Sequence, residues 1–167
     1  MNILKIINSS QVEPKDYAPR VTVKAVVLDK DSQVLLFSHS LPGGGVKENE
    51  TFEQALHREC LEEVGYSVNI TKSLGVVIQY RDILKKKYEV HGFLARVTGV
   101  KSAPRTIQED ELGKSIEWLP LEGAIAKLAQ RIKELEQTDT SQYPGDVFQS
   151  KLYNSMTTLA FLEEAKK

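Results

Sequence analysis

Cysteine, long apolar runs and net charge are all scarce in this chain of 167 residues. A single cysteine, Cys60, excludes an intrachain disulfide and leaves the cytoplasm as the default compartment. No apolar run approaches the roughly 18 residues of a membrane span, and the opening MNILKIINSSQVEP lacks the apolar core and cleavage site of a signal peptide. A formal net charge of -1 provides no overall basic field for nucleic acid or anionic membrane. An anionic substrate must therefore be held by local groups.

The remaining composition is that of an ordinary globular domain. Hydrophobic residues make up 41% of the chain and charged residues 27%, far from the composition of disordered chains. The length suits one domain and is too short for two well-packed ones. We expect a single domain over residues 1–167, with the core from about residue 20 and residues 1–19 as an N-terminal lead.

Hydrophobic periodicity predicts the order of helices and strands. Runs rich in β-branched and aliphatic residues predict strands at 21–29, 33–38, 66–80, 87–99 and 116–120. A run of helix formers predicts a helix from about residue 51, closed by Gly65 at its C-cap. Apolar residues at helical spacing predict two more helices, after residues 121 and 147. The fold class is therefore α/β, with helices packed on a mixed sheet.

Three glutamates share one face of the helix predicted after residue 51. At about 100° per residue, Glu59, Glu62 and Glu63 lie within an arc of about 100°. The same side carries Phe52, Ala55 and Leu56, so the acidic face is expected to point partly inward. Like charges at this spacing repel, and desolvation increases the cost. A hard divalent cation such as Mg²⁺ would compensate them better than zinc, since the chain has no Cys/His ligand set. The alternative is a solvated acidic helix face.

The spacing from Gly44 to Tyr66 resembles the Nudix box, G x5 E x7 R E U x E E x G U. Its fixed positions are filled by Gly44, Glu50, Arg58, Glu59, Glu62, Glu63 and Gly65. Cys60 and Tyr66 stand where the family usually has a bulky aliphatic residue, and both still read as packing positions. Outside the box the resemblance is looser, limited to the flanking strands, Trp118 and the final helices. It implies a Nudix-like α/β/α sandwich.

The resemblance also implies an activity. Members of this family cleave a diphosphate bond in a nucleoside diphosphate linked to another moiety, by metal-activated attack of water. The implied cofactor is Mg²⁺, for which Mn²⁺ can substitute. The implied partner is a small nucleotide-derived molecule; a homodimer stays open, no membrane is expected, and nucleic acid enters only as capped or 5'-phosphorylated RNA.

The resemblance assigns metal ligands by position. Glu59 and Glu63 are the first metal ligands and Glu62 the next, with the Gly43 carbonyl as a further ligand. Glu59 is also a candidate general base. Outside the box, Glu111 is a candidate for an additional metal ligand or base, and the alternative for it is an exposed acidic loop.

Other residues receive supporting roles. Arg58 is expected to orient the glutamates by bidentate pairing, and Glu50 to support the helix start or a water in the metal shell. Gly44 and Gly45 would let the backbone approach the substrate. His39, just before the glycines, is a candidate substrate contact.

Alternative functions fit the sequence less well. The three glycines are not followed by the Lys-Ser/Thr pair of a P-loop. Cys60 occupies a packing position, which disfavours a thiol nucleophile, and no cysteine lies near the glycines as in the isoprenoid diphosphate isomerase subgroup. A non-catalytic Nudix-fold sensor of nucleotides stays the main competitor, although such modules usually lose box glutamates. The subfamily signatures that would identify the substrate are not found.

Overall fold

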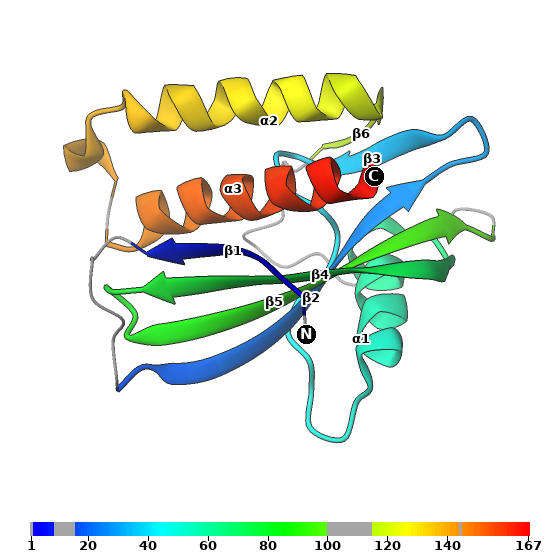
Figure 1. Cartoon of the computed structure of the whole chain (residues 1–167), viewed down its shortest axis with the longest axis horizontal. Coiled ribbons are helices and arrows are strands. Elements are labelled where there is room, and N and C mark those ends of the chain that lie inside the picture. The colour runs from blue at the N-terminus through cyan, green and yellow to red at the C-terminus, as the bar shows by residue number, and fades with distance from the viewer. Residues whose placement is uncertain (1, 9–15, 100–114, 144) are drawn as a thin grey trace.

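The structure is a computed structural model that describes residues 2–8, 16–99, 115–143 and 145–167. Within these ranges, six strands form one sheet in the order β1-β4-β5-β2-β3-β6 (Figure 1). The strands are β1 (Ile3–Asn8), β2 (Ala18–Leu28), β3 (Gln33–Phe37), β4 (Val68–Arg81), β5 (Lys86–Val97) and β6 (Ile116–Pro120). The helices are α1 (Phe52–Glu59), the π-helical turn η1 (Cys60–Val64), α2 (Leu121–Glu136), the 3-10 turn η3 (Thr140–Gln142) and α3 (Val147–Ala165).

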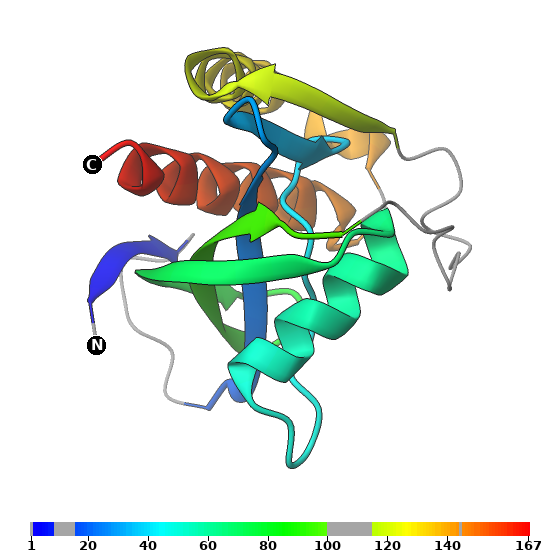
Figure 2. The same cartoon turned by 90° about the vertical axis from the view of Figure 1, so that its right-hand side faces the viewer.

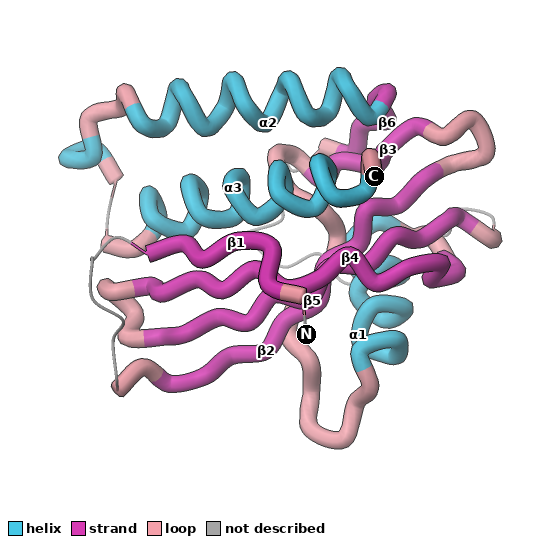
Figure 3. The backbone as a smooth tube through the Cα atoms, in the orientation of Figure 1, coloured by secondary structure: helices cyan, strands magenta, loops and turns pink. Residues whose placement is uncertain are grey.

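The sheet is mixed, as predicted. β1 pairs with β4, and β2 with β5, in parallel, while the other neighbouring strands are antiparallel. Figure 3 shows β1, β4, β5 and β2 running side by side at one end of the molecule. β1 was not predicted, and it lies inside the expected N-terminal lead. Of its isoleucines only Ile7 is buried, and Ile3 and Ile6 are exposed, so no apolar alternation marks the strand.

Helices cover both faces of the sheet, and strand alternation divides the core between them. Val23, Ala25 and Val27 of β2 pack in one cluster with α1 and η1. Val26 points to the other face and packs with residues of α2 and α3. Figure 2 shows α1 and α3 on opposite sides of the strands. This arrangement is the predicted α/β/α sandwich.

The helix that carries the glutamates is irregular at its C-terminal end. The Thr51 side chain caps it by accepting a hydrogen bond from the Gln54 amide, and the Gln54 side chain accepts one from the Thr51 amide in return. The predicted C-cap at Gly65 is confirmed, with φ 75° in the left-handed region. The prediction of a regular α-helix as far as Gly65 was wrong, because the residues from Cys60 to Val64 follow π-helical hydrogen bonding. Such turns are often found at functional sites, and here one displaces Glu62 and Glu63 from the 100° spacing.

None of the described helices combines the length and hydropathy that a membrane crossing requires.

Candidate active site

The glycine loop lies against β2 like an additional short strand. The Val23 amide donates to the Gly44 carbonyl at 2.9 Å, and the Ala25 amide donates to the Pro42 carbonyl at 3.0 Å. A Cβ on Gly43 would lie 2.1 Å from the Val23 carbonyl oxygen, and the Gly43 φ of +133° is rare for other residues. Glycine is therefore required at Gly43 by both contact and conformation.

Arg58 connects the acidic residues to this loop. Its Nε and Nη2 each donate to a separate oxygen of Glu50, both at 2.8 Å. Its Nη1 donates to Glu59 at 2.6 Å and to Glu62 at 3.3 Å, and its Nη2 also donates to the Gly45 carbonyl at 3.0 Å. Arg58 therefore holds three carboxylates and the glycine loop in fixed positions relative to one another, as predicted for a residue that orients the glutamates. The pairing with Arg58 lowers the pKa of Glu50 from 4.5 to about 2.

Two carboxylates face the glycine loop directly. The Gly43 amide donates to Glu63 Oε2 at 2.7 Å. A Cβ added to Gly44 would lie 2.5 Å from Glu59 Oε1, so the Glu59 carboxylate sits immediately against this glycine. Glu62, with a third of its side chain exposed, is the most open of the glutamates bonded to Arg58. Glu59 and Glu63, which lie 15 and 20 positions from Gly44 and Gly43 in the sequence, are thus brought against one loop.

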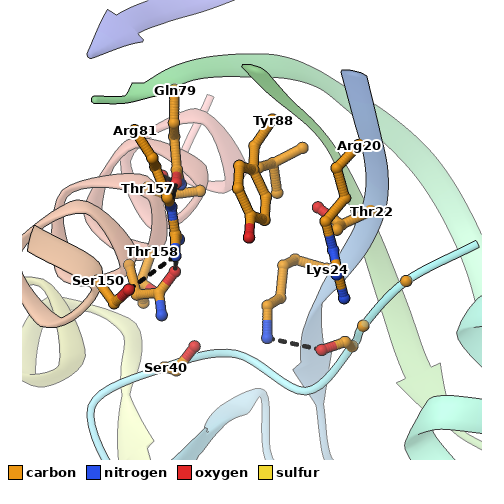
Figure 4. A pocket seen from close by; sticks show the side chains of 15 residues that line it. Arg20, Thr22, Lys24, Ser40, Gln79, Arg81, Tyr88, Ser150, Thr157 and Thr158 are labelled. Carbon is orange, nitrogen blue, oxygen red and sulfur yellow. Dashed lines mark hydrogen bonds between the residues drawn. The ribbon is translucent and has the colours of Figure 1, made fainter. Parts of the chain in front are cut away.

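Lys24, in the middle of β2, was not predicted as part of the site. Its ammonium donates to the carbonyls of Leu41 and Gly43, both at 2.7 Å, and Figure 4 shows the side chain reaching the loop. A lysine interrupting the apolar run VTVKAVVLD was the available signal, because a charge inside a strand that is covered on both faces needs partners.

A cavity of about 380 Å³ opens beside the glycine loop. The described residues that line it include the cations Arg20, Lys24 and Arg81 and none that is acidic. Figure 4 shows Tyr88 between Arg81 on one side and Arg20 on the other. Gly44 and Gly45, predicted to contact substrate, line this cavity together with Gly43.

Strand register explains why these side chains share the cavity. Arg20 of β2 pairs with Tyr88 of β5, which pairs with Gln79 of β4. Arg81 lies two residues beyond Gln79 and therefore points to the same face. This set was not predicted, because the strand expected at 66–80 stops before Arg81 and the residues meet only through sheet pairing.

His39 lies apart from the cation-lined cavity. It lines an adjoining cavity of about 350 Å³ with Glu63 and Arg131, and Lys24 contributes to both cavities. Burial, and then the nearby charge of Arg131, lower the pKa of His39 below its ordinary 6.5. The predicted Glu111 lies outside the described residues.

The chain is similar in sequence to two curated proteins and in fold to a solved structure. Diphosphoinositol polyphosphate phosphohydrolase 3-alpha of Mus musculus is 29% identical over 125 residues, which cover 70% of this chain and 72% of that protein. A putative 8-oxo-dGTP diphosphatase of Bacillus subtilis (strain 168) is 35% identical over 80 residues, which cover 44% and 51% of the two chains. A solved NUDIX hydrolase from Nitrosomonas europaea has a TM-score of 0.55 at 20% identity, over 84% of this chain and 90% of that one.

A match to a protein-family model identifies the family of this chain. A family model described as the NUDIX domain matches residues 18–138, which include the glycine loop, α1, η1 and the sheet from β2 to β6. The chain therefore belongs to the Nudix family and is a Nudix pyrophosphohydrolase.

Proposed function

We propose that this enzyme hydrolyses the diphosphate bond of a nucleoside diphosphate linked to another moiety, with Mg²⁺ as its metal and Mn²⁺ as a substitute. The observation that carries the proposal is the position of Glu59 and Glu63 against one glycine loop that also borders a cation-lined cavity. Carboxylates and cations on the two sides of a loop suit a metal and a phosphate chain held side by side.

The donor atoms at the loop fit a hard divalent cation. Glu59 and Glu63 offer carboxylate oxygens at the loop, and Glu62 offers a further carboxylate. The Gly43 carbonyl accepts a hydrogen bond from the Lys24 ammonium at 2.7 Å, so it would bind the cation only if that bond were given up. In the described part of the chain, no three Asp, Glu, His or Cys side chains lie close enough together to hold a metal ion by themselves. Mg²⁺ is commonly held by one or two carboxylates and completes its shell with water and substrate phosphates, so it does not require three such side chains. When bound, the cation would lower the pKa of water and neutralise phosphate oxygens.

The chain's own residues would position the reacting groups. Arg58 engages Oε1 of Glu59, which leaves Oε2 of Glu59 to accept the proton of the attacking water. Glu50, held by two hydrogen bonds, fixes the guanidinium of Arg58 and through it the direction of Glu59. Arg58 and Glu50 act in this proposal as positioning residues.

The names of the relatives agree with chemistry on linked phosphates. The mouse protein is named as a phosphohydrolase of a diphosphoinositol polyphosphate, and the Bacillus subtilis protein as a putative 8-oxo-dGTP diphosphatase. The two substrates differ outside the phosphates, so the moiety must be determined by assay for this chain.

The test is a substrate panel of nucleoside triphosphates, nucleotide sugars, ADP-ribose, dinucleoside polyphosphates and capped RNA. We expect turnover of at least one with Mg²⁺, slower or equal turnover with Mn²⁺, and none in EDTA. Absence of turnover across the panel would favour a nucleotide-sensing module instead.

The role of Glu59 has a matched control on the same helix. Glu59→Gln keeps the size of the side chain and should lower kcat by orders of magnitude while the melting temperature is kept. Glu53→Gln is the control, because the Glu53 side chain is 70% exposed and lies 3.8 Å from His57 Nε2, away from the Arg58 network. Equal loss of activity in both variants would contradict the assignment.

A further inference from the structure

Arg81 is a buried cation that the proposed hydrolysis does not use. Only 7% of the residue is exposed. Its guanidinium donates to Gln79 Oε1, Ser150 Oγ and Asn154 Oδ1, each at 2.9 Å, and all three acceptors are neutral. Among the residues that the structure describes, no carboxylate forms an ion pair with it. Asp146, which accepts a hydrogen bond from the Ser150 hydroxyl at 3.3 Å, attracts Arg81 from beyond ion-pair distance. A buried charge with no direct ion pair is costly, and an anion in the cavity would lower that cost further.

Arg20 adds a second positive charge to the same cavity. Its Cζ lies 5.6 Å from the centre of the Tyr88 ring, and that of Arg81 lies 4.1 Å from it, so the two guanidinium groups flank one ring. Burial lowers the pKa of Arg81, and the nearby charge of Arg20 lowers it to a smaller extent, while Tyr88 and Asp146 act in the opposite direction. Within the described ranges Arg20 has no ion pair either. The two arginines repel each other, and a bound anion would relieve that repulsion.

The rest of the cavity wall favours phosphate over an apolar group. Helix α3 lines it with hydroxyl and amide groups, from Ser150, Asn154, Thr157 and Thr158. Among the described residues of the lining, Tyr88 is the only aromatic one, and the arginines on either side of it leave little open ring surface for a stacking base. Guanidinium groups match phosphate oxygens with paired hydrogen bonds. A phosphate group fits these walls better than a nucleobase.

The cavity is close enough to the proposed reaction centre to hold part of the same substrate. Gly43, Gly44 and Gly45 form one of its walls, and Glu59 and Glu63 contact two of these glycines. A Cβ on Gly45 would lie 3.5 Å from Arg20 Nη2, so this arginine reaches the loop itself.

We propose that Arg20 and Arg81 bind a phosphate group of the substrate other than the two joined by the scissile bond. This inference rests on the proposed function and narrows it. The preferred substrates are then diphosphates whose attached moiety carries an additional phosphate, rather than those with a neutral sugar alone.

The first test measures binding without metal and without turnover. Isothermal titration with tripolyphosphate in EDTA should give measurable affinity for the wild-type protein, and Arg20→Gln should weaken it about tenfold. Lys72→Gln is the control, because Lys72 is an exposed cation of β4 outside the cavity lining. Equal affinity of wild-type and Arg20→Gln proteins would overturn the proposal, as would equal weakening by Lys72→Gln.

The second test compares substrates that differ by one phosphate. Wild-type kcat/KM should be at least about tenfold higher for NADPH than for NADH, and for coenzyme A than for its 3'-dephospho form. Arg20→Gln should reduce that ratio towards one, mainly through KM of the phosphorylated member. Arg81→Lys, which keeps the charge but loses the paired donors, should reduce it partly. A ratio that is unchanged in both variants would overturn the proposal.

The two tests separate this inference from the proposed function. Arginine-dependent binding of tripolyphosphate by a protein that hydrolyses nothing would support the phosphate site and refute the proposed hydrolysis. Metal-dependent hydrolysis that ignores both arginines would do the reverse.

Discussion

The contact between Gly44 and Glu59 allows a sharp test of the active site with one added methyl group. In Gly44→Ala the new Cβ would lie 2.5 Å from Oε1, 2.6 Å from Cδ and 2.8 Å from Oε2 of Glu59, whereas ordinary contacts begin at 3.4 Å. The carboxylate must therefore retreat by about 1 Å. Because it is the far end of a flexible side chain, it can do so without moving the backbone.

We expect Gly44→Ala to separate activity from stability. A displacement of about 1 Å at a catalytic group lowers the rate by about 100-fold, so kcat should fall by that order. The free energy of unfolding should change by less than about 1 kcal/mol, because the loss of flexibility in the unfolded chain offsets the weakened bond to Arg58.

The assay combines steady-state kinetics on the best substrate of the panel with urea denaturation. The control is Gly123→Ala in α2, where the nearest atom to the new Cβ is Pro120 Cδ at 3.8 Å, and where alanine favours the helix. A Gly44→Ala enzyme with kcat within twofold of wild type would refute the argument that Glu59 must rest against this glycine. A Gly44→Ala protein that is strongly destabilised would refute the assumption that the side chain alone gives way.

Three further predictions concern stability and reactivity. The hydrogen bonds from Arg58 hold the pKa of Glu50 at about 2 in the folded state, against an ordinary 4.5. The ionised carboxylate therefore stabilises the fold above pH 4.5, and this contribution is lost as the pH falls through about 2. Urea denaturation should therefore show a flatter acid limb for Glu50→Gln, and parallel limbs would contradict the ion pair. Gly92→Ala would place a Cβ 2.2 Å from the buried Phe161 ring and should cost about 1–3 kcal/mol, partly restored by Phe161→Leu; an unchanged denaturation midpoint would contradict this packing. Burial raises the pKa of the Cys60 thiol to about 12, so an aromatic disulfide reagent at pH 8 should label it only after denaturation, and rapid native labelling would show that it is accessible.

The fold was predictable where apolar residues form nearly continuous runs. β2 and β3 read as strands because both faces of the sheet are covered, and every second residue packs on a different helix layer. β1 was missed because only Ile7 of its side chains is buried, and its pairing with β4 depends on main-chain contacts that any sequence can make. The π-helical turn after Glu59 was missed for a similar reason, since residue spacing alone does not tell a regular helix from one with a shifted hydrogen-bond register.

The site was predictable where one segment of the chain carries it. Glu50, Arg58 and Glu59 stand within ten residues, so the spacing of the box already contains their mutual contacts. Arg20 and Arg81 are 61 positions apart on different strands, and Ser150 and Asn154, which accept hydrogen bonds from Arg81, come from the last helix. No local pattern brings such residues together, because strand register and helix docking determine which of them meet.

Gly43 joins the two charged halves of the site through its own peptide groups. Its amide donates to Glu63 on the acidic side, and its carbonyl accepts from Lys24 on the basic side. A net charge of -1 hides this division, since the acidic helix and the cation-lined cavity cancel in the sum while remaining separate in space. The loop can be this thin only because Gly43 has no side chain to hold it away from Val23. The Nudix motif begins in this glycine loop. In the proposed function, the loop is also the boundary at which the metal and a phosphate-rich substrate would meet.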